Sequence, residues 1–493
     1  MTDLTRRRLL QAAALAPLAV ACDAWGGKAL RKLVGQSAAA TFRIDADKPG
    51  RAVAQTLAGL SYETLQVIEG GYLSARNTDL VKLFRELNPH GVLRIGGNSS
   101  DWTVWGEYRG AIAAYKPDGR GPTTPYVLRR ENIEELAGFL RATGWKLIFG
   151  VNLKIGLPDM GAQLAAAVRK ICGDALLAIQ IGNEANNFEP DYAAFIEAWL
   201  PYAKAIRAEG IPLGGPDTGA NTDWVIAYAE RYGKDNVLLS RHYYRGGEKH
   251  GSIRDLLSGD PGFYAQVDEI MRVADARSLP FYLSEANSYW SGGRDGVSNA
   301  FASALWGADY MLALARRGVA CIDFHGGTLA VDQASLGKTV HPHMGGDLTA
   351  RRDAVTAYYG PIAGDGTLGF QPAPLYHGMQ LAQRFAGARM LSARLDDGGA
   401  NLTAYAAQRG DDVLVALINK DIHRDVMVSL RGLHGRIPTH DMRLTAPALD
   451  ARRGTVFGTA AAGMRVVRGG DGKAFALRVS RGSAAWLVFR RQA

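Results

Sequence analysis

Between residues 55 and 330, short apolar or β-branched runs alternate with segments whose apolar residues recur every three or four positions. This alternation predicts strand–helix units arranged around a parallel sheet. Eight runs are expected to be strands, which is the number that closes a (β/α)8 TIM barrel. They span residues 57–65, 91–99, 146–155, 176–188, 211–219, 236–244, 279–289 and 318–327.

The segments between these runs have helical character. Apolar positions recur along 78–87, which Asn77 is expected to cap, along 132–142, and along 191–208 before Gly210. An open, doubly wound sheet shows the same alternation. The barrel is favoured because polar and aromatic residues gather at the C-terminal end of nearly every predicted strand, where barrel active sites lie.

After about residue 385 the period changes to that of half-buried strands. Apolar and polar residues alternate along 401–407, 413–419, 426–430, 474–479 and 485–489, a pattern typical of an antiparallel β-sandwich. Residues 41–46 alternate in the same way. We therefore expect an export signal and linker (1–35), an N-terminal strand that joins the sandwich (36–55), a catalytic barrel (56–385) and a β-sandwich (386–493).

The N-terminus is typical of an export signal. Arg6, Arg7 and Arg8 precede an apolar stretch over 9–21 that is too short and isolated to be a membrane anchor. The paired arginines resemble a twin-arginine signal, so we expect a periplasmic or secreted protein. Cys22 offers an alternative, a lipid anchor, and no other stretch is apolar enough to cross a membrane.

The composition excludes several function classes. The formal net charge is +9, but no dense basic run with interleaved aromatic residues indicates a nucleic-acid partner. The three cysteines have neither the number of a disulfide framework nor the spacing of metal ligands. We expect no metal, no organic cofactor and a monomeric chain.

Two glutamates stand where a barrel would place them opposite each other. Glu184 ends the fourth predicted strand in the segment 180–184, and Glu285 ends the seventh in 281–287. Glycoside cleavage needs such a pair, one carboxyl to protonate the leaving oxygen and one to attack or stabilise the anomeric carbon. A separation of about 5–5.5 Å gives retention and a wider one gives inversion. Either glutamate alone is readily explained as a solvated loop residue, whereas the pair favours catalysis.

Other strand ends supply candidate substrate contacts. They are Glu63, Asn98, Asp101, Asn183, Asp217, His242, Tyr243, Tyr244, His325, Gly326 and Gly327. Structural explanations stand beside these: Arg94 could pair internally with Glu63, and His325 could be a core histidine with its hydrogen bonds satisfied. The glycine pairs 96–97 and 326–327 would let a sugar approach the backbone closely.

At these residues the chain resembles glycoside hydrolase family 79, the bacterial β-glucuronidases and heparanase-like enzymes. The similar stretches are 59–63, 92–99, 144–153, 181–184, 215–218, 242–244, 285–288 and 324–327. The resemblance implies a retaining β-glucuronidase in which Glu184 is the general acid/base and Glu285 the nucleophile. It also implies that Asn183 binds the sugar 2-hydroxyl and that Tyr243 orients the nucleophile.

The chain departs from the family where glucuronide-cleaving relatives bind the substrate carboxylate. Those relatives use a tyrosine after the nucleophile, where this chain has Tyr289 one position early and then Trp290. They also use a Gly-Tyr pair after the eighth strand, where this chain has Thr328 and Leu329. Trp290 and Leu329 cannot donate the same hydrogen bonds, so a neutral or otherwise altered β-glycoside is the alternative substrate.

The segment 330–359 is expected to form a lid or to supply a replacement carboxylate site. Its basic residues are Lys338, His341, His343, Arg351 and Arg352. Exo action is favoured because the heparin-binding type of basic cluster is not evident. An inactive glycan-binding protein is a further alternative, but it predicts the loss of one of the two carboxylates, and both are present.

Overall fold

The computed structural model describes residues 37–112, 115, 121–462, 465–468 and 474–492. The predicted export signal and Cys22 lie outside these residues. Within the described part of the chain, no helix is both long enough and apolar enough to span a bilayer.

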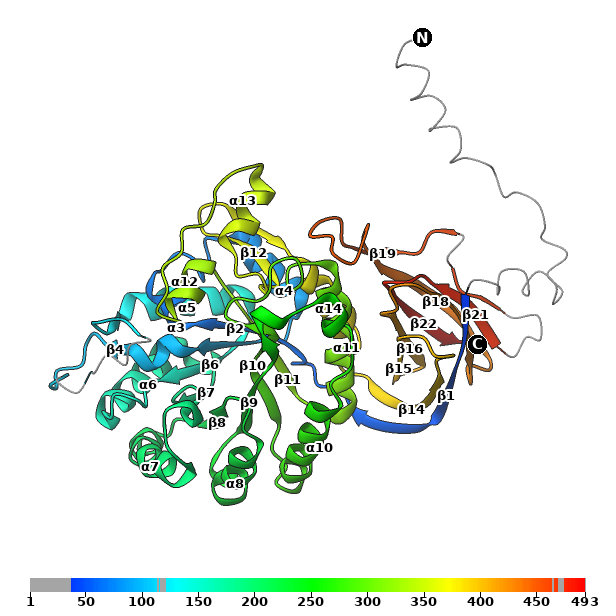
Figure 1. The fold of residues 1–493 in the computed structure, drawn as a ribbon. Coiled ribbons are helices and arrows are strands. Elements are labelled where there is room, and N and C mark those ends of the chain that lie inside the picture. The colour runs from blue at the N-terminus through cyan, green and yellow to red at the C-terminus, as the bar shows by residue number, and fades with distance from the viewer. Residues whose placement is uncertain (1–36, 113–114, 116–120, 463–464, 469–473, 493) are drawn as a thin grey trace, which may run out of the picture.

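Eight parallel strands form a barrel, as the sequence predicts, and not an open sheet (Figure 1). The hydrogen-bonded order is β7-β6-β3-β2-β11-β10-β9-β8. A parallel bridge between Ile179 and Leu213 joins the two ends of this order. In chain order the strands are β2 (Ala58–Glu63), β3 (Val92–Gly96), β6 (Lys146–Val151), β7 (Leu176–Ile181), β8 (Gly214–Thr218), β9 (Leu238–Gly247), β10 (Phe281–Trp290) and β11 (Cys321–Gly326).

Helices surround the barrel because each carries an apolar face that packs against the strands (Figure 1). The first seven are α4 (Thr78–Leu87), α5 (Arg130–Thr143), α6 (Pro158–Cys172), α7 (Tyr192–Ala208), α8 (Thr222–Tyr232), α10 (Pro261–Ala276) and α11 (Phe301–Arg317). Asp191 and Asp260 cap α7 and α10 by accepting backbone N–H bonds. The expected cap at Asn77 is wrong: its amide donates to Gly71 and Tyr72 carbonyls instead.

The eighth helix of the ring, α14 (Pro374–Gln383), follows a long insertion after β11. The insertion holds α12 (Leu329–Ala334), α13 (Leu348–Val355) and the hairpin β12 (Ile362–Asp365) and β13 (Gly369–Pro372). This segment, which the sequence predicts to be a lid, rises over the C-terminal ends of the barrel strands in Figure 1.

The second domain is a sandwich of predominantly antiparallel strands. The strand β1 (Ser37–Ala52) pairs antiparallel with β14 (Arg389–Asp396) and parallel with β17 (Asp425–Arg431). The remaining strands are β15 (Leu402–Arg409), β16 (Asp412–Asn419), β18 (Arg436–Thr445), β19 (Val456–Thr459), β20 (Val467–Arg468), β21 (Ala474–Val479) and β22 (Ser483–Arg491).

The strand β16 is buried on both faces, which fixes the sandwich against the barrel. Val413, Val415 and Leu417 enter the core of the sandwich. Leu414 and Ile418 point the other way and join the hydrophobic core that continues into the barrel domain. A strand covered on both faces has a nearly continuous apolar sequence, as the run 413–418 has.

Candidate active site

Two glutamate carboxylates meet at the C-terminal mouth of the barrel. Glu285 lies on β10, and Glu184 follows β7 in a left-handed backbone conformation (φ 49°). The Glu184 N–H donates to the Asp217 carbonyl at 2.9 Å, which fixes this turn. One carboxylate oxygen of each glutamate and a ring nitrogen of His242 all lie within 4.8 Å of one another. The Glu285 side chain is buried and the Glu184 side chain is partly exposed.

Glu285 is surrounded by groups that favour its ionised form. Arg94 Nη1 donates to Oε2 at 2.5 Å, and the Tyr244 hydroxyl donates to Oε1 at 2.9 Å. His325 Nδ1 and His242 Nδ1 lie 3.8 and 4.0 Å from the carboxylate. Burial opposes ionisation, but the charge that His325 carries at low pH and the charges of His242 and Arg94 outweigh it and lower the pKa of Glu285 to about 2. This carboxylate is therefore ready to act as a nucleophile at neutral pH.

Arg94 connects the polar groups in the centre of the barrel. Its Nη2 donates to Asp217 Oδ2 at 2.6 Å and to Asn183 Oδ1 at 2.7 Å, in addition to the bond with Glu285. The alternative of an internal pair between Arg94 and Glu63 is not what the structure has, because Glu63 accepts hydrogen bonds from Ser99 N and Oγ at 2.9 and 2.5 Å. A guanidinium with several donors suits such shared binding of carboxylates.

The glycine pairs at the strand ends make room for protein side chains. A Cβ at Gly96 would lie 2.5 Å from Arg94 Cζ, and one at Gly97 would lie 2.3 Å from the Glu63 carboxylate. At Gly326 and Gly327, a Cβ would meet Pro361 and Gln66 at 3.2 and 2.9 Å. These four glycines therefore allow protein groups to pack closely, and their presence does not require a sugar against the backbone.

His242 lies between the second glutamate and Asp217. Its Nδ1 is 3.0 Å from Glu184 Oε1, and its Nε2 is 3.1 Å from Asp217 Oδ1. Although burial lowers the pKa of His242, the Asp217 and Glu285 charges outweigh it and raise this pKa to about 10. Arg94 and His242 together hold the pKa of Asp217 below its usual range despite burial. His242 is thus an imidazolium that donates one hydrogen bond to each neighbouring carboxylate.

Asp101 and Asn98 act on the site through Asn183. The Asp101 carboxylate accepts from the backbone N–H of Leu153 at 3.0 Å and of Asn183 at 2.9 Å, which ties the ends of β6 and β7 together. The Asn183 amide in turn donates to Asn98 Oδ1 at 3.3 Å. With both of its oxygens used in this way, Asp101 is a positioning residue.

Glu63 and His325 complete the floor of the site. His325 Nδ1 lies 3.0 Å from Ser61 Oγ, and its Nε2 lies 3.8 Å from Glu63 Oε1. Burial lowers the pKa of His325 to about 4, so this ring is neutral at pH 7. Burial and the nearby Glu285 charge raise the pKa of Glu63 to about 7.

The curated proteins that resemble this chain in sequence are β-glucuronidases and heparanases. No family model matches the chain. A β-glucuronidase from Neurospora crassa is 25% identical over 308 residues, which cover 51% of this chain and 54% of that protein. A β-glucuronidase from Aspergillus niger is 38% identical over 275 residues (48% and 51%), and bovine (Bos taurus) heparanase is 27% identical over 212 residues (38% and 39%). The resemblance to glycoside hydrolase family 79 is confirmed.

The chain spans about half the length of the β-glucuronidases that it matches. Solved structures extend the likeness over nearly the whole chain. A 4-O-α-L-rhamnosyl-β-D-glucuronidase from Fusarium oxysporum aligns with a TM-score of 0.64 and 17% identity, covering 91% of this chain and 100% of that one. A family 51 arabinofuranosidase from Xanthomonas axonopodis aligns with the same TM-score at 16% identity (92% and 100%). These likenesses show the fold, a barrel with an attached sandwich.

One role implied by family 79 falls on a neighbouring residue. Tyr243 does not orient Glu285: its hydroxyl donates to Asp260 at 2.7 Å, and its ring packs against Phe263 and Tyr310. Tyr244 makes the contact with Glu285 instead. Successive residues of a strand point to opposite faces, so the shift by one position exchanges the two environments.

The tyrosine and tryptophan after Glu285 do not reach the catalytic carboxylates. The Tyr289 hydroxyl donates to Asp255 at 2.6 Å. Trp290 is 51% exposed and its indole lies against Gly247 at the rim. The basic residues of the insertion are also outside the site: Lys338, His341, His343 and Arg351 are exposed, and Arg352 donates to the Leu368 carbonyl.

The insertion contributes an acidic residue that sequence reasoning missed. Asp332 of α12 is buried and accepts hydrogen bonds from the Tyr359 hydroxyl and from Gln333. The Tyr359 ring lies 5.8 Å from the His325 ring and 6.2 Å from that of Tyr244, so this pair adjoins the catalytic groups. Burial, with the Glu285 charge adding to it, raises the pKa of Asp332 to about 6. No motif in the sequence marks this residue.

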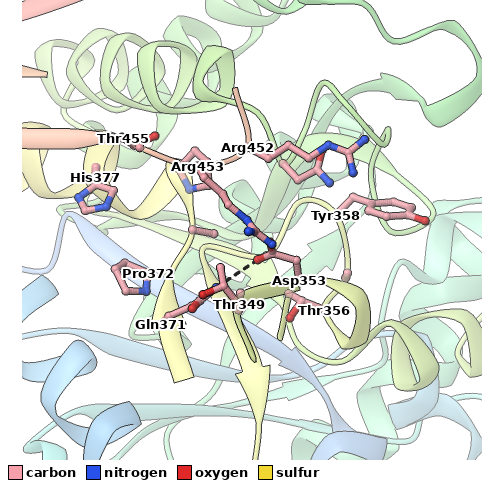
Figure 2. Close-up of a pocket in the computed structure, with 17 residues that line it drawn as sticks. Thr349, Asp353, Thr356, Tyr358, Gln371, Pro372, His377, Arg452, Arg453 and Thr455 are labelled. Atoms are coloured by element: carbon pink, nitrogen blue, oxygen red, sulfur yellow. Dashed lines mark hydrogen bonds and ion pairs between the residues drawn. The ribbon is translucent and has the colours of Figure 1, made fainter. Parts of the chain in front are cut away.

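Two cavities are lined in part by residues of the insertion. One, of about 190 Å³, lies beside Glu184 and is bounded by side chains from β3, β6 and β7 loops and by the insertion: Asn98, Trp102, Lys154, Phe188, Ser335 and Leu336. The other, of about 420 Å³, lies between the insertion and the loop 452–455 of the sandwich (Figure 2). Among the residues that line it, Asp353 accepts from Gln371 at 3.2 Å and lies 3.6 Å from Arg453, and none of the strand-end carboxylates lines it. The first cavity is therefore the one of the two that adjoins a catalytic candidate, Glu184.

Proposed function

We propose that this protein is a retaining β-glycosidase that cleaves β-glucuronides, with Glu285 as nucleophile and Glu184 as general acid/base. The separation of at most 4.8 Å between their carboxylate oxygens carries the proposal. Retaining enzymes have carboxyl groups about 5–5.5 Å apart, whereas inverting enzymes need about 6.5–9.5 Å to admit a water. The short separation of Glu184 and Glu285 therefore fits a retaining mechanism and leaves too little room for the water of an inverting one.

In the first step a Glu285 oxygen bonds to the anomeric carbon while the bond to the leaving oxygen breaks. Glu184 gives its proton to that oxygen. His242 donates to Oε1 of Glu184 and the Asn187 amide donates to Oε2, so both oxygens of this carboxyl group are held in place. Arg94 and the Tyr244 hydroxyl hold Glu285 in place for the attack.

In the second step water attacks the same carbon and the bond to Glu285 breaks. Glu184, now ionised, takes the proton from that water, which returns both carboxyl groups to their starting states. In this proposal Asn183, whose Oδ1 accepts from Arg94, contacts the sugar 2-hydroxyl, as the resemblance to family 79 implies. Hydrogen bonds at this hydroxyl strengthen in the transition state.

The choice of glucuronides rests on the β-glucuronidases among the relatives. A neutral β-glycoside is the second candidate, and one observation favours it. Asp332 is an acidic group close to Glu285, on the side where Trp290 and Leu329 replace the family's carboxylate-binding tyrosines. A substrate carboxylate next to an ionised Asp332 would be repelled.

Exo action, a monomeric state and export are further parts of the proposal. A small cavity that ends at Ser335 and Leu336 of the insertion suits a terminal sugar better than the middle of a chain. Export is supported by Arg6–Arg8 and the apolar stretch 9–21. Size-exclusion chromatography and fractionation of expressing cells would test the last two.

The reaction is tested by following an aryl β-glucuronide in the NMR spectrometer from the first minutes. A retaining enzyme releases the β-anomer first, and initial release of the α-anomer would contradict the mechanism. Glu285→Gln and Glu184→Gln should each lower kcat by at least about a thousandfold. Glu189→Gln, in the same loop as Glu184 but outside the catalytic contacts, is the matched control and should keep the wild-type rate.

A further inference from the structure

Two tyrosine hydroxyls beside the nucleophile already donate to protein carboxylates. The Tyr244 hydroxyl donates to Glu285 at 2.9 Å, and the Tyr359 hydroxyl donates to Asp332 of the insertion. The two tyrosine rings lie 6.2 Å apart, so both hydroxyls belong to the same region of the barrel mouth. A phenol carries one hydrogen. Neither hydroxyl therefore has a hydrogen left for a substrate carboxylate, although each oxygen can still accept from a sugar hydroxyl.

Asp332 is held in place by the insertion and by the loop that follows β10. The Gln333 amide donates to Asp332 Oδ2 at 2.9 Å and to the Ser291 carbonyl at 3.1 Å, which uses both of its hydrogens. A Cβ at Gly292 would lie 2.8 Å from the same carboxylate oxygen, so this glycine makes room for Asp332. The carboxylate is therefore fixed between the two segments, with its other oxygen on the Tyr359 hydroxyl.

Asp332 is in electrostatic contact with groups from three barrel strands as well as from the insertion. These groups are Glu63, Tyr244, Glu285, Gln333, Tyr359 and Lys338. Burial raises the pKa of Asp332 to about 6 and the Glu285 charge adds to this, while hydrogen bonds within the insertion and the Lys338 charge oppose it. This carboxyl group therefore gains or loses its proton not far from neutral pH, next to the nucleophile.

The number of hydrogens shared by Asp332 and Tyr359 decides what the pair can bind. With Asp332 ionised there is one hydrogen, and it lies between the two residues. The pair then offers only acceptor oxygens and a negative charge. With Asp332 protonated there are two hydrogens, and one O–H group is free to donate outward. A sugar hydroxyl, which both donates and accepts, suits the pair in either state, whereas a substrate carboxylate suits the protonated state alone.

We propose that Asp332 and Tyr359 determine which sugar Glu285 attacks. With Asp332 ionised, the pair accepts from a hydroxyl of a neutral sugar and repels a uronate. With Asp332 protonated, the pair donates to the uronate carboxylate. The inference rests on the proposed glycosidase function and specifies its substrate choice: the β-glucuronide and the neutral β-glycoside are substrates of one site, and the proton on Asp332 sets the preference between them.

The test is the ratio of kcat/KM for an aryl β-glucuronide to kcat/KM for the matched aryl β-glucoside, measured from pH 5 to pH 8. The two substrates differ only at C6, so the ionisation of Glu184 and Glu285 affects both alike and cancels in the ratio. We expect the wild-type ratio to fall by about 10- to 100-fold over this range as Asp332 loses its proton. A ratio that does not change with pH would overturn the inference.

Variants of the pair identify the group that is responsible. Asp332→Asn is neutral at every pH, so its ratio should vary by less than about twofold from pH 5 to pH 8. Tyr359→Phe should lower the ratio at pH 5, because one of the two O–H groups is lost. Asp353→Asn is the matched control: Asp353 is a half-buried acid of the same insertion that lines the other cavity, and its loss should leave the wild-type profile unchanged. A wild-type pH dependence in Asp332→Asn would assign the effect to Glu63 and overturn the inference.

A binding measurement separates this result from failure of the proposed reaction. Calorimetric titration of Glu184→Gln with glucuronate and with glucose, at pH 5 and pH 8, reports the same preference without turnover. If wild type hydrolyses neither aryl glycoside, the glycosidase proposal fails, and the titration still tests the pair. If wild type hydrolyses either of them, and neither the ratio nor the binding preference depends on pH, only the assignment of Asp332 and Tyr359 fails.

Discussion

Arg94 Nη1 lies 2.5 Å from Oε2 of Glu285, and both side chains are buried. The same guanidinium binds Asp217 at 2.6 Å, so two carboxylates share one cation in the centre of the barrel. The proximity of both acids raises the pKa of Arg94 above its usual range although burial opposes this. The nucleophile candidate thus depends on a charge from β3, on the other side of the barrel.

Replacement of Arg94 tests this dependence. Arg94→Met should destabilise the fold by about 3–5 kcal/mol, because Asp217 and Glu285 would remain buried without their shared cation. Arg94→Lys should fold better but lose kcat, since one ammonium cannot reach the same set of acceptors. Chemical denaturation and initial rates measure the two effects. Wild-type stability of Arg94→Met would contradict the assigned role.

Tyr244 should matter for the reaction and Tyr243 should not. Tyr244→Phe removes a hydrogen bond to a charged group, so we expect a loss of about 10- to 100-fold in kcat/KM. The variant should also raise the pKa of Glu285 and move the acid limb of the pH–rate profile upward. Tyr243→Phe is the matched control and should change stability only, through Asp260. If Tyr243→Phe lowered the rate more than Tyr244→Phe, Tyr243 would be the residue that orients Glu285, as the resemblance to family 79 implies.

The arrangement of the barrel strands and of the two glutamates followed from the sequence because both depend on local signals. Strand runs are marked by apolar period, and parallel strands end at one edge, so Glu184 and Glu285 had to meet there. To choose between Tyr243 and Tyr244, one has to know which of the two side chains lies on the face of β9 that points into the site. His242 and Tyr244 are two positions apart and share a face, so a role for His242 in the site would have indicated Tyr244.

Other features depend on contacts between distant segments. The partner of Arg94 could not be predicted, since Glu63, Asp217 and Glu285 are all acidic residues at strand ends. Strand β14 was missed because its second half is mostly exposed and its apolar pattern is weak. Strand β18 contains Pro438 and several charged residues, and it forms by pairing with β22.

The pH dependence of stability follows from the altered pKa values. Burial raises the pKa of Glu63 and Asp101 to about 7, and Asp217 and Glu285 raise that of His242 to about 10 despite burial. The folded state therefore binds these protons more tightly than the unfolded state. The stability that they contribute is complete below the ordinary values of 4.5, 3.8 and 6.5 and is lost as the pH rises through the folded values.

Asp217 and Glu285 act in the opposite direction, since their pKa values are lowered and their contribution is lost as the pH falls below about 4. We therefore expect the highest Tm at roughly pH 4–5 and a fall on the order of 5–10 °C by pH 9. Differential scanning calorimetry from pH 3 to 10 measures this. His242→Gln should make the Tm fall less steeply on the alkaline side. A Tm maximum near pH 8 would contradict the raised pKa values of Glu63, Asp101 and His242.

The barrel and the sandwich are joined by a buried ion pair. Lys420, which follows β16, lies 2.5 Å from Asp309 of α11, and the Tyr405 hydroxyl donates to the same carboxylate at 2.6 Å. The Lys420 charge holds the pKa of Asp309 below its usual value although burial opposes this. Lys420→Met would leave Asp309 buried without a counter-charge, at a cost of about 3–5 kcal/mol.

The double variant Asp309→Asn with Lys420→Met should recover much of that loss, because it removes both charges from the interface. Lys82→Met is the matched control: Lys82 forms an exposed pair with Glu86 at 3.7 Å, and its loss should leave the Tm unchanged. Thermal unfolding of wild type, Lys420→Met, Asp309→Asn and the double variant gives the coupling directly. Catalytic rates should stay at the wild-type level in all of them below the transition, since α11 and β16 support the barrel from outside the mouth. A single Lys420→Met variant as stable as wild type would mean that the two domains are held together by the apolar contacts of β16 alone.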